Sequence, residues 1–404
     1  MIKKSKKLAD ILFVSAFLIF IAVISAVTIV KPKLQVSYYE NRTLWQRPDT
    51  KFRSMLVNNY FNRWERFLCD QAAGRQTLVQ LATRIDLNVI RRPVVHDVVV
   101  SEGVFLRYNG FGPVNKTLIA EQSRNVVAEL SALRDVVESY GGALYYVAIP
   151  AHYTWFADKY PWYLDSREAY TDAAYEAFVS DMADAGIGLI LTGMDPDTEG
   201  AEEERALYSA SDHHFTFYGA YETYRSIVDR INSDGVFYLP PLVEGVNFEF
   251  YTLPNPYMGS RMRMLMNIPG ITERTTIAVL NEEIPFTRAD NGVVSGKPTV
   301  YTLPFGQREV VNYGIYMGGD HAETVIDTGR DLPSVLIYGE SYTNAVESLM
   351  YASCGEMRSI DLRHYKEMPL IEYVEIYRPD IVLCVRGYEA LVYIHDNGTV
   401  TVVE

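Results

Sequence analysis

The feature that most constrains this chain of 404 residues is an apolar run from Ile11 to Val30, 20 residues without a charge or a proline. A helix of about 20 apolar residues spans the hydrocarbon core of a bilayer. The run is preceded by four lysines: Lys3, Lys4, Lys6 and Lys7. Because positively charged flanks stay on the cytoplasmic side, the pattern predicts a single-pass anchor in the cell membrane, with everything after about residue 31 outside the cytoplasm.

A cleaved signal peptide is the alternative interpretation of this run. Its apolar core would be about 7–15 residues long and would end at a small-x-small site. The sequence Ser25-Ala26-Val27 matches such a site poorly. The uncleaved anchor is therefore preferred, and both interpretations place the rest of the chain in the same compartment.

Charge and cysteine content exclude several classes of protein. A net charge of −14, with no basic stripe, argues against a nucleic-acid partner, because binding phosphates requires a basic face. The three cysteines, Cys69, Cys354 and Cys384, are far apart and in no metal-ligand spacing. They predict neither a disulfide framework nor a zinc ribbon, and we expect all three to be buried as apolar residues.

Beyond the anchor at 1–30, the pattern predicts a lead-in segment at 31–110 and a larger domain at 111–404. The lead-in has a helical stretch at 51–90 and a pair of strands at 94–106, separated by Gly103. In the larger domain, apolar strands alternate with helices. We expect strands at 143–149, 187–191, 334–338, 357–361 and 380–385, and helices at 116–139, 172–185, 217–231, from 342 onward and at 368–377.

Strands that alternate with helices predict an α/β fold with a parallel sheet flanked by helices. The alternation breaks at about 239–331, which is dense in Pro, Gly and Tyr and has only short β-like runs, such as 274–280 and 298–303. We interpret this region as a β-rich insertion into the larger domain.

Two segments fit the rule that working residues gather where the strands of such a sheet end and helices begin. In Tyr338-Gly339-Glu340-Ser341-Tyr342, an apolar strand leads through a glycine, expected to make a tight turn, to a serine at the start of a helix. Backbone N–H groups there would face charge that develops on a bound carbonyl. The alternative is that Ser341 only caps the helix.

The second segment, Ser211-Asp212-His213-His214-Phe215-Thr216, leads into the helix at 217–231. An Asp two residues before a His can hold the imidazole through Nδ1 while Nε2 takes a proton from a serine. We expect His213 to point elsewhere, in a packing role. An isolated Asp-x-His is weak evidence, and a purely structural role is the alternative.

A zinc site is a further alternative, built from Asp212, His213 and His214 with Asp320-His321. Adjacent histidines point in different directions, and no H-x-x-E-H or similar ligand spacing is present. We therefore expect no metal ion and no other cofactor.

At these positions the chain resembles the DHHW family of SGNH-hydrolase-like proteins, relatives of the alginate O-acetylation proteins. The resemblance covers most of the chain beyond the anchor. It is carried by Glu40-Asn41-Arg42, Asp70-Gln71 with Gly74-Arg75, Ile149-Pro150, Asp212-His213-His214-Phe215 with Gly219-Ala220, Gly318-Gly319-Asp320-His321, Glu340-Ser341-Tyr342 and Ile360-Asp361-Leu362-Arg363.

The resemblance implies an SGNH-like α/β fold with a Ser-His-Asp triad. Ser341 would be the nucleophile, His214 the general base and Asp212 its orienting carboxylate. Gly319, Asp320 and Tyr342 would line the oxyanion or substrate site.

Three residues depart from the pattern of the family. Phe215 replaces the usual Trp, and Glu340 stands where a shorter residue is common. Asp320 stands where Asn is typical, and an ionised carboxylate cannot donate a hydrogen bond to an oxyanion.

The resemblance implies an extracytoplasmic O-acyltransferase, with acetyl as the expected acyl group, that acts on a cell-surface polysaccharide through an acyl-serine. A polytopic membrane-bound O-acyltransferase would supply the acyl group. An acetyl esterase with the same triad is one alternative. A carbohydrate-binding or assembly protein without catalysis is another, which Asp320 and Glu340 motivate.

Overall fold

The computed structural model describes residues 2–400 except 41, 57–58, 109, 111, 193, 195–205, 271–272 and 394–399. Asn41 of the Glu40–Arg42 motif and the side chains of the N-terminal lysines lie outside the described part. The contacts divide the chain into two compact units, one of residues 1–96 with 263–269 and one of 97–262 with 270–404. The predicted domain boundary at residue 110 stays a prediction.

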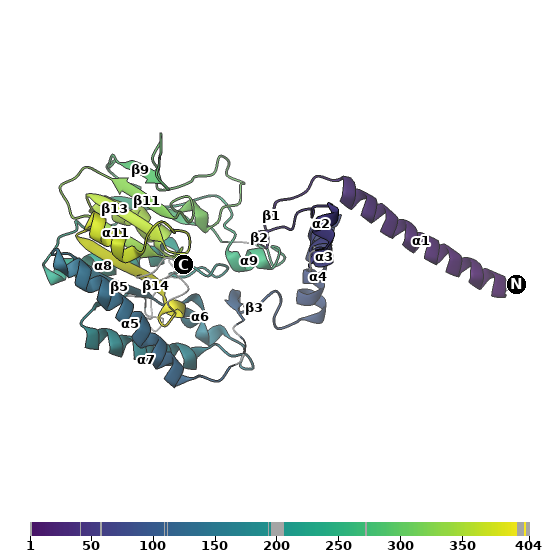
Figure 1. Cartoon of the computed structure of the whole chain (residues 1–404), viewed down its shortest axis with the longest axis horizontal. Helices are drawn as coiled ribbons and strands as arrows, with labels where there is room; N and C mark the ends of the chain where they lie inside the picture. The colour runs from purple at the N-terminus through teal and green to yellow at the C-terminus, as the bar shows by residue number, and fades with distance from the viewer. Residues whose placement is uncertain are drawn as a thin grey trace. The chain divides into compact units, whose positions relative to one another are not determined.

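The smaller unit begins with helix α1 (Ile2–Val30) (Figure 1). Its part from Asp10 to Val30 has a mean hydropathy of 2.8 and is, among the described residues, the one helix long and apolar enough to cross a membrane. The unit's other elements are β1 (Val36–Ser37), β2 (Arg42–Thr43), α2 (Phe52–Met55), α3 (Tyr60–Gln71), α4 (Arg75–Ile85) and a π-helical turn (Asp86–Ile90). The predicted stretch 51–90 is therefore helical but interrupted. Between α3 and α4 lies Gly74, whose φ of +73° a side chain would rarely adopt.

Ion pairs connect the sequence blocks of the smaller unit. The Arg75 guanidinium donates to both carboxylate oxygens of Glu40, at 2.7 and 2.9 Å. Arg42 donates to both oxygens of Asp70, at 2.8 and 2.6 Å. Such bidentate pairs fix geometry as well as adding energy, so the Glu40–Arg42 motif holds the segment after the anchor against α3 and α4.

The expectation that all three cysteines are buried is wrong for one of them. Cys354 and Cys384 are buried, but Cys69 is exposed. Helix α3 buries Tyr60, Phe67, Asp70 and Gln71, which share one face at helical spacing. Cys69 lies off this face.

The larger unit confirms the predicted α/β fold. In the described part of the chain, eight strands form one sheet in the order β10-β9-β11-β13-β12-β14-β5-β6. From β13 to β6 the neighbours are parallel, as expected. The strands are β5 (Ala143–Ile149), β6 (Gly188–Leu191), β9 (Thr287–Asp290), β10 (Val293–Val294), β11 (Glu323–Asp327), β12 (Val335–Gly339), β13 (Glu356–Asp361) and β14 (Ile381–Gly387).

Helices cover both faces of this sheet (Figure 1). One face packs on α8 (Phe217–Asp234) and α10 (Thr343–Met350). The other packs on α5 (Lys116–Ser139), α7 (Glu168–Ala185) and α11 (Leu370–Tyr377). Alternate residues of the central strands enter the two cores, which is why these strands read as continuous apolar runs.

The insertion at 239–331 is β-rich, as predicted, and part of it extends the main sheet. Strands β9 and β11 pair antiparallel with each other, and β11 pairs antiparallel with β13. A separate hairpin joins β7 (Phe248–Thr252) to β8 (Thr276–Leu280). The short helix α9 (Ser260–Met264) lies between them in the sequence. The expected β run at 298–303 contributes only an isolated bridge, Tyr301 to Tyr316, in the described residues.

The predicted strand pair at 94–106 is also present, as β3 (Val98–Ser101) and β4 (Val104–Arg107). It belongs to the larger unit. The Phe105 backbone N–H donates to the Ala210 carbonyl at 2.8 Å. Strand β4 thereby supports the loop that carries the two adjacent histidines.

Gly339 ends β12 just before the turn to α10, but its role differs from the expected tight turn. Its φ is not in the left-handed region. A Cβ at this position would instead lie 2.3 Å from the Val385 carbonyl oxygen and 2.8 Å from the Thr343 side chain. Glycine is required here because β14 approaches the backbone closely.

We expect Gly339→Ala to lower the free energy of unfolding by about 1–3 kcal/mol, the usual cost of forcing an extra carbon into a packed site. Chemical denaturation of the full chain in detergent, followed by circular dichroism, measures the change. Gly296→Ala is the matched control, because a Cβ there meets no atom within 4 Å. Equal stability of the two variants would contradict the close-approach explanation.

Candidate active site

Ser341 lies in the turn between β12 and α10, at the carboxyl edge of the parallel strands. Its side chain is partly exposed. Its Oγ is 2.7 Å from Nε2 of His214, 127 residues earlier in the chain. The Asn344 backbone N–H donates to the Ser341 carbonyl at 3.3 Å, so the serine already takes part in the first turn of the helix.

His214 lies in the loop that leads into α8, as the sequence predicted. The hydroxyl of Thr216 caps this helix by accepting a hydrogen bond from the Gly219 N–H at 3.4 Å. Gly219 lies so close to the preceding chain that a Cβ would come within 2.4 Å of the Leu207 carbonyl oxygen. The loop is therefore held tightly where it meets the helix.

Asp212 is 2% exposed and accepts hydrogen bonds at both carboxylate oxygens. Oδ1 accepts from the Ser260 hydroxyl and from the His213 backbone N–H, each at 2.7 Å, and lies 3.3 Å from His214 Nδ1. Oδ2 accepts from the Tyr257 hydroxyl. Burial alone would raise the pKa of Asp212, but the charge of His214 and the hydrogen bonds from both histidines hold that pKa well below its usual range. The carboxylate is therefore ionised.

Aromatic rings enclose the imidazole of His214. The Tyr313 ring stacks on one face, with centroids 3.7 Å apart and planes at 6°. The His213 ring lies 3.7 Å away at an angle of 39°, and Tyr342 meets the imidazole edge to face at 5.1 Å. These contacts restrict rotation of the ring, so Nε2 stays directed at Ser341.

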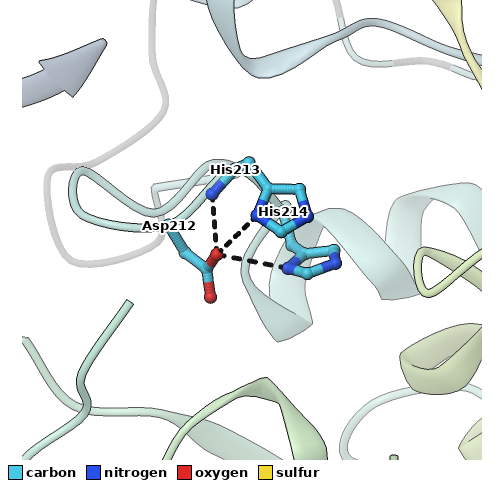
Figure 2. Close-up of side chains that lie close together, drawn as sticks. All are labelled: Asp212, His213 and His214. Carbon is cyan, nitrogen blue, oxygen red and sulfur yellow. Dashed lines mark hydrogen bonds and ion pairs between the residues drawn. The ribbon is translucent and has the colours of Figure 1, made fainter. Parts of the chain in front are cut away.

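His213 does not point elsewhere, contrary to our expectation. Its Nδ1 lies 3.0 Å from Asp212 Oδ1 and 2.7 Å from Ser260 Oγ. Figure 2 shows both imidazoles against the same carboxylate oxygen. The alternating directions of adjacent side chains apply to an extended strand, whereas this segment is a tight loop whose curvature brings both rings to one side.

The Tyr342 side chain contacts the histidine loop, and the assignment of Tyr342 to the oxyanion or substrate site stays a prediction. Its side chain is 2% exposed, and its hydroxyl donates to the His213 carbonyl at 2.5 Å. The side chain therefore supports the histidine loop. Among the described residues, the backbone N–H groups of Ser341 and Tyr342 have no hydrogen-bond partner, which leaves both as candidate donors to an oxyanion.

The Gly319-Asp320 segment is also occupied by protein contacts. The Gly319 N–H donates to the Tyr316 carbonyl at 3.1 Å. The Asp320 carboxylate accepts from Asn344 Nδ2 at 2.9 Å and from the Arg363 guanidinium at 3.2 Å. The Gly319 N–H is thus already bonded, and the Asp320 carboxylate accepts hydrogen bonds and has none to donate to an oxyanion. The assignment of both residues to the oxyanion site stays a prediction.

Two sets of described side chains bring possible metal-ligating atoms within 4.8 Å of one another: Asp212 with His213 and His214, and Asp320 with Asp361 and His364. In the first set the Asp212 carboxylate already accepts hydrogen bonds from protein donors. In the second, the Arg363 guanidinium donates to both carboxylates. His321, which the zinc alternative required, has its Nε2 3.2 Å from the Met317 carbonyl oxygen.

Several residues of the site gave no signal in the sequence. Tyr257 and Ser260, which bind Asp212, and Tyr313, which stacks on His214, all come from the insertion. Gly259 permits the contact, because a Cβ there would lie 2.3 Å from the Ser211 carbonyl. Their spacing follows no motif; the concentration of Pro, Gly and Tyr in the insertion was the only available hint.

Glu340, one of the departures from the family pattern, also has a structural role. Its Oε1 accepts a hydrogen bond from the Gly387 backbone N–H at 3.2 Å. Gly387 is the last residue of β14. The longer side chain at position 340 therefore ties the serine turn to the end of the neighbouring strand.

The arrangement is the one that proton transfer from a serine requires. The carboxylate holds the histidine through Nδ1, and Nε2 lies within hydrogen-bond distance of the hydroxyl. In such a geometry the histidine takes the serine proton as the oxygen attacks a carbonyl carbon.

Comparison with solved structures supports the fold. No protein-family model matches the chain, and no curated protein matches it in sequence. Bacillus cereus PatB1, solved with a sulfonyl adduct, superposes with a TM-score of 0.59 at 17% identity, over 73% of this chain and 94% of PatB1. A DHHW family protein from Eubacterium siraeum superposes with a TM-score of 0.54 at 17% identity, over 76% of this chain and 97% of that one.

A third match is the O-acetyltransferase domain of Pseudomonas putida AlgJ, with a TM-score of 0.44, 13% identity and coverage of 73% and 92%. The fold that the resemblance to DHHW proteins implied is confirmed. This chain has the fold shared by PatB1 and the DHHW family protein of Eubacterium siraeum.

Proposed function

We propose that this protein is a membrane-anchored, extracytoplasmic O-acyltransferase that transfers an acetyl group to a cell-surface polysaccharide. Ser341 is the nucleophile, His214 the general base and Asp212 the residue that orients it. The observation that carries the proposal is the hydrogen-bond chain from Ser341 Oγ through His214 to a buried, ionised Asp212. The acetyl group and the polysaccharide come from the resemblance of the sequence blocks.

In the first step, Ser341 Oγ attacks the carbonyl carbon of the acyl donor and His214 Nε2 takes the hydroxyl proton. The bond to the donor's leaving group breaks, and His214 returns the proton to that group. The product is an acyl-serine. The Asp212 carboxylate stabilises the imidazolium that forms in between, and the stacked Tyr313 ring adds a favourable cation–π contact.

In the second step, a sugar hydroxyl attacks the acyl carbon of the acyl-serine. His214 takes the proton from that hydroxyl and returns it to Ser341 Oγ as the bond to the serine breaks. The backbone N–H groups of Ser341 and Tyr342 lie at the helix start, where they are suited to stabilise the oxyanion of each tetrahedral intermediate. Asp320 then has no part as an oxyanion donor.

Water competes with the sugar for the acyl-serine, so the same residues support an acetyl esterase. Anchoring by α1 favours transfer, because it would keep Ser341 near a polytopic O-acyltransferase that delivers the acyl group across the bilayer. The non-catalytic alternative predicts a serine without nucleophilic reactivity.

We expect phenylmethylsulfonyl fluoride to sulfonylate Ser341 Oγ with loss of fluoride, which intact-protein and peptide mass spectrometry would detect. Ser341→Ala and His214→Ala should each lower turnover of p-nitrophenyl acetate at least about a thousandfold, because members of a triad act as a unit. Asp212→Ala should also lower turnover of p-nitrophenyl acetate, by a factor about ten to a hundred times smaller than in Ser341→Ala or His214→Ala.

The matched control is Ser131→Ala, since Ser131 binds only the Val127 carbonyl within α5 in the described contacts. It should leave both turnover and labelling unchanged. A wild-type protein that is folded but not labelled at Ser341 would support the non-catalytic alternative.

Asp320→Asn tests whether the carboxylate at this position matters. We expect it to preserve or raise turnover of p-nitrophenyl acetate, because the oxyanion donors are backbone groups. Loss of the partly exposed pair with Arg363 should cost about 0–1 kcal/mol of stability. A drop of more than about tenfold in kcat, with the fold intact by circular dichroism, would show that the carboxylate has a role of its own.

The proposed location predicts that protease added to intact cells or protoplasts removes the chain beyond residue 31. Immunoblotting for the larger unit measures this loss, with a cytoplasmic protein as the control for lysis. Protection of that unit would contradict the topology. A mature protein that starts near Ala26 would show cleavage in place of anchoring.

A further inference from the structure

The second histidine of the loop, His213, takes no proton in the mechanism above, but its contacts help to hold His214 and Asp212. His213 Nδ1 lies 3.0 Å from Asp212 Oδ1 and 2.7 Å from Ser260 Oγ. Its carbonyl accepts a hydrogen bond from the buried Tyr342 hydroxyl. Both its backbone and one ring nitrogen are thus fixed, while its side chain stays 33% exposed.

The hydrogen bonds determine where His213 carries its proton. The Ser260 hydroxyl has one proton, which it donates to Asp212 Oδ1 at 2.7 Å. At its contact with His213, the Ser260 oxygen can therefore only accept. His213 must then be protonated at Nδ1, which leaves Nε2 with a lone pair and no hydrogen-bond partner among the described residues.

The two imidazoles face the same way. Each turns Nδ1 toward Asp212, so each directs Nε2 away from it, as Figure 2 shows. The ring centroids are 3.7 Å apart. Two acceptor nitrogens therefore lie side by side, and that of His214 is at Ser341 Oγ. The oxygen atoms of neighbouring hydroxyls on one sugar ring are separated by a distance comparable to that between these two imidazole rings.

We propose that the acceptor is a sugar with vicinal hydroxyls, of which one reacts at His214 while its neighbour donates a hydrogen bond to His213 Nε2. This rests on the proposed function and adds a substrate class to it. His213 touches the substrate as a specificity-determining residue and takes no proton.

The environment of His213 keeps this acceptor available. Partial burial, the largest effect, and the charge of neighbouring His214 lower the pKa of His213. At neutral pH the ring is therefore neutral, and Nε2 accepts a hydrogen bond. A protonated ring in this place would also repel the imidazolium that His214 forms during each step.

The test measures partition of the acetyl-enzyme formed from p-nitrophenyl acetate by the full chain in detergent. Cyclohexane-1,2-diol and cyclohexanol are the acceptors, each compared with water through the ratio of ester to acetate. Two substitutions separate the ring nitrogens. His213→Asn keeps an amide near Nδ1 and loses Nε2, whereas His213→Gln keeps a polar atom near Nε2.

For the wild type we expect the diol to be preferred about tenfold beyond the statistical factor for two hydroxyls, the effect of one well-placed hydrogen bond. His213→Asn should remove this preference. Because the preference is a ratio between two acceptors of the same acetyl-enzyme, slower acylation of Ser341 after loss of the His213 ring contact does not change it. His213→Gln should keep part of the preference. This contrast separates substrate contact from a structural role, which would lower sulfonylation and transfer together.

An unchanged preference in His213→Asn would overturn the inference, and so would a wild type that labels at Ser341 but does not distinguish the two acceptors. In both cases the proposed function would stand. Failure of the wild type to label at Ser341 is a different result, which would defeat the proposed function and the inference together.

Discussion

The site depends on one buried charge. An ionised carboxylate taken out of water is costly unless hydrogen bonds and opposite charge compensate it, and Asp212 is 2% exposed. Its donors come from the histidine loop and from the insertion, where Tyr257 and Ser260 lie. Removing the insertion would leave the carboxylate short of donors, so the insertion is a structural part of the candidate site.

The same carboxylate explains how adjacent histidines acquire different roles. Both rings turn Nδ1 toward Asp212, but only His214 reaches the serine. Stacking between Tyr313 and His213 holds the ring of His214, and Ser260 fixes the tautomer of His213. One carboxylate thus orients both rings, with Nε2 of His214 at Ser341 Oγ and Nε2 of His213 without a hydrogen-bond partner among the described residues.

The sheet supplies the other half of the geometry. Parallel strands bring the turn after β12 and the end of β14 to one edge, where a hydrogen bond from Gly387 to Glu340 connects them. Close approach of Val385 at Gly339 leaves no room for a side chain. The packing of β12 against β14 therefore fixes the position of Ser341. Helix α10 then begins directly after this fixed turn.

The sequence by itself predicted most helices and strands of the larger unit and named the candidate groups Asp212, His214 and Ser341, which the structure brings together. Alternation of apolar strands and helices predicted the parallel sheet because both faces of its strands are buried, and the Asp-x-His and Gly-Glu-Ser segments predicted groups that the structure brings together.

The fold decided what depends on contacts distant in sequence: the insertion residues around Asp212, the inward turn of His213, the burial of Tyr342 and the exposure of Cys69. The spacing of apolar residues predicts which side of a helix or strand is buried. It does not predict a hydrogen bond such as that from Ser260 to Asp212, which joins positions 48 residues apart and forms only when the two loops fold together.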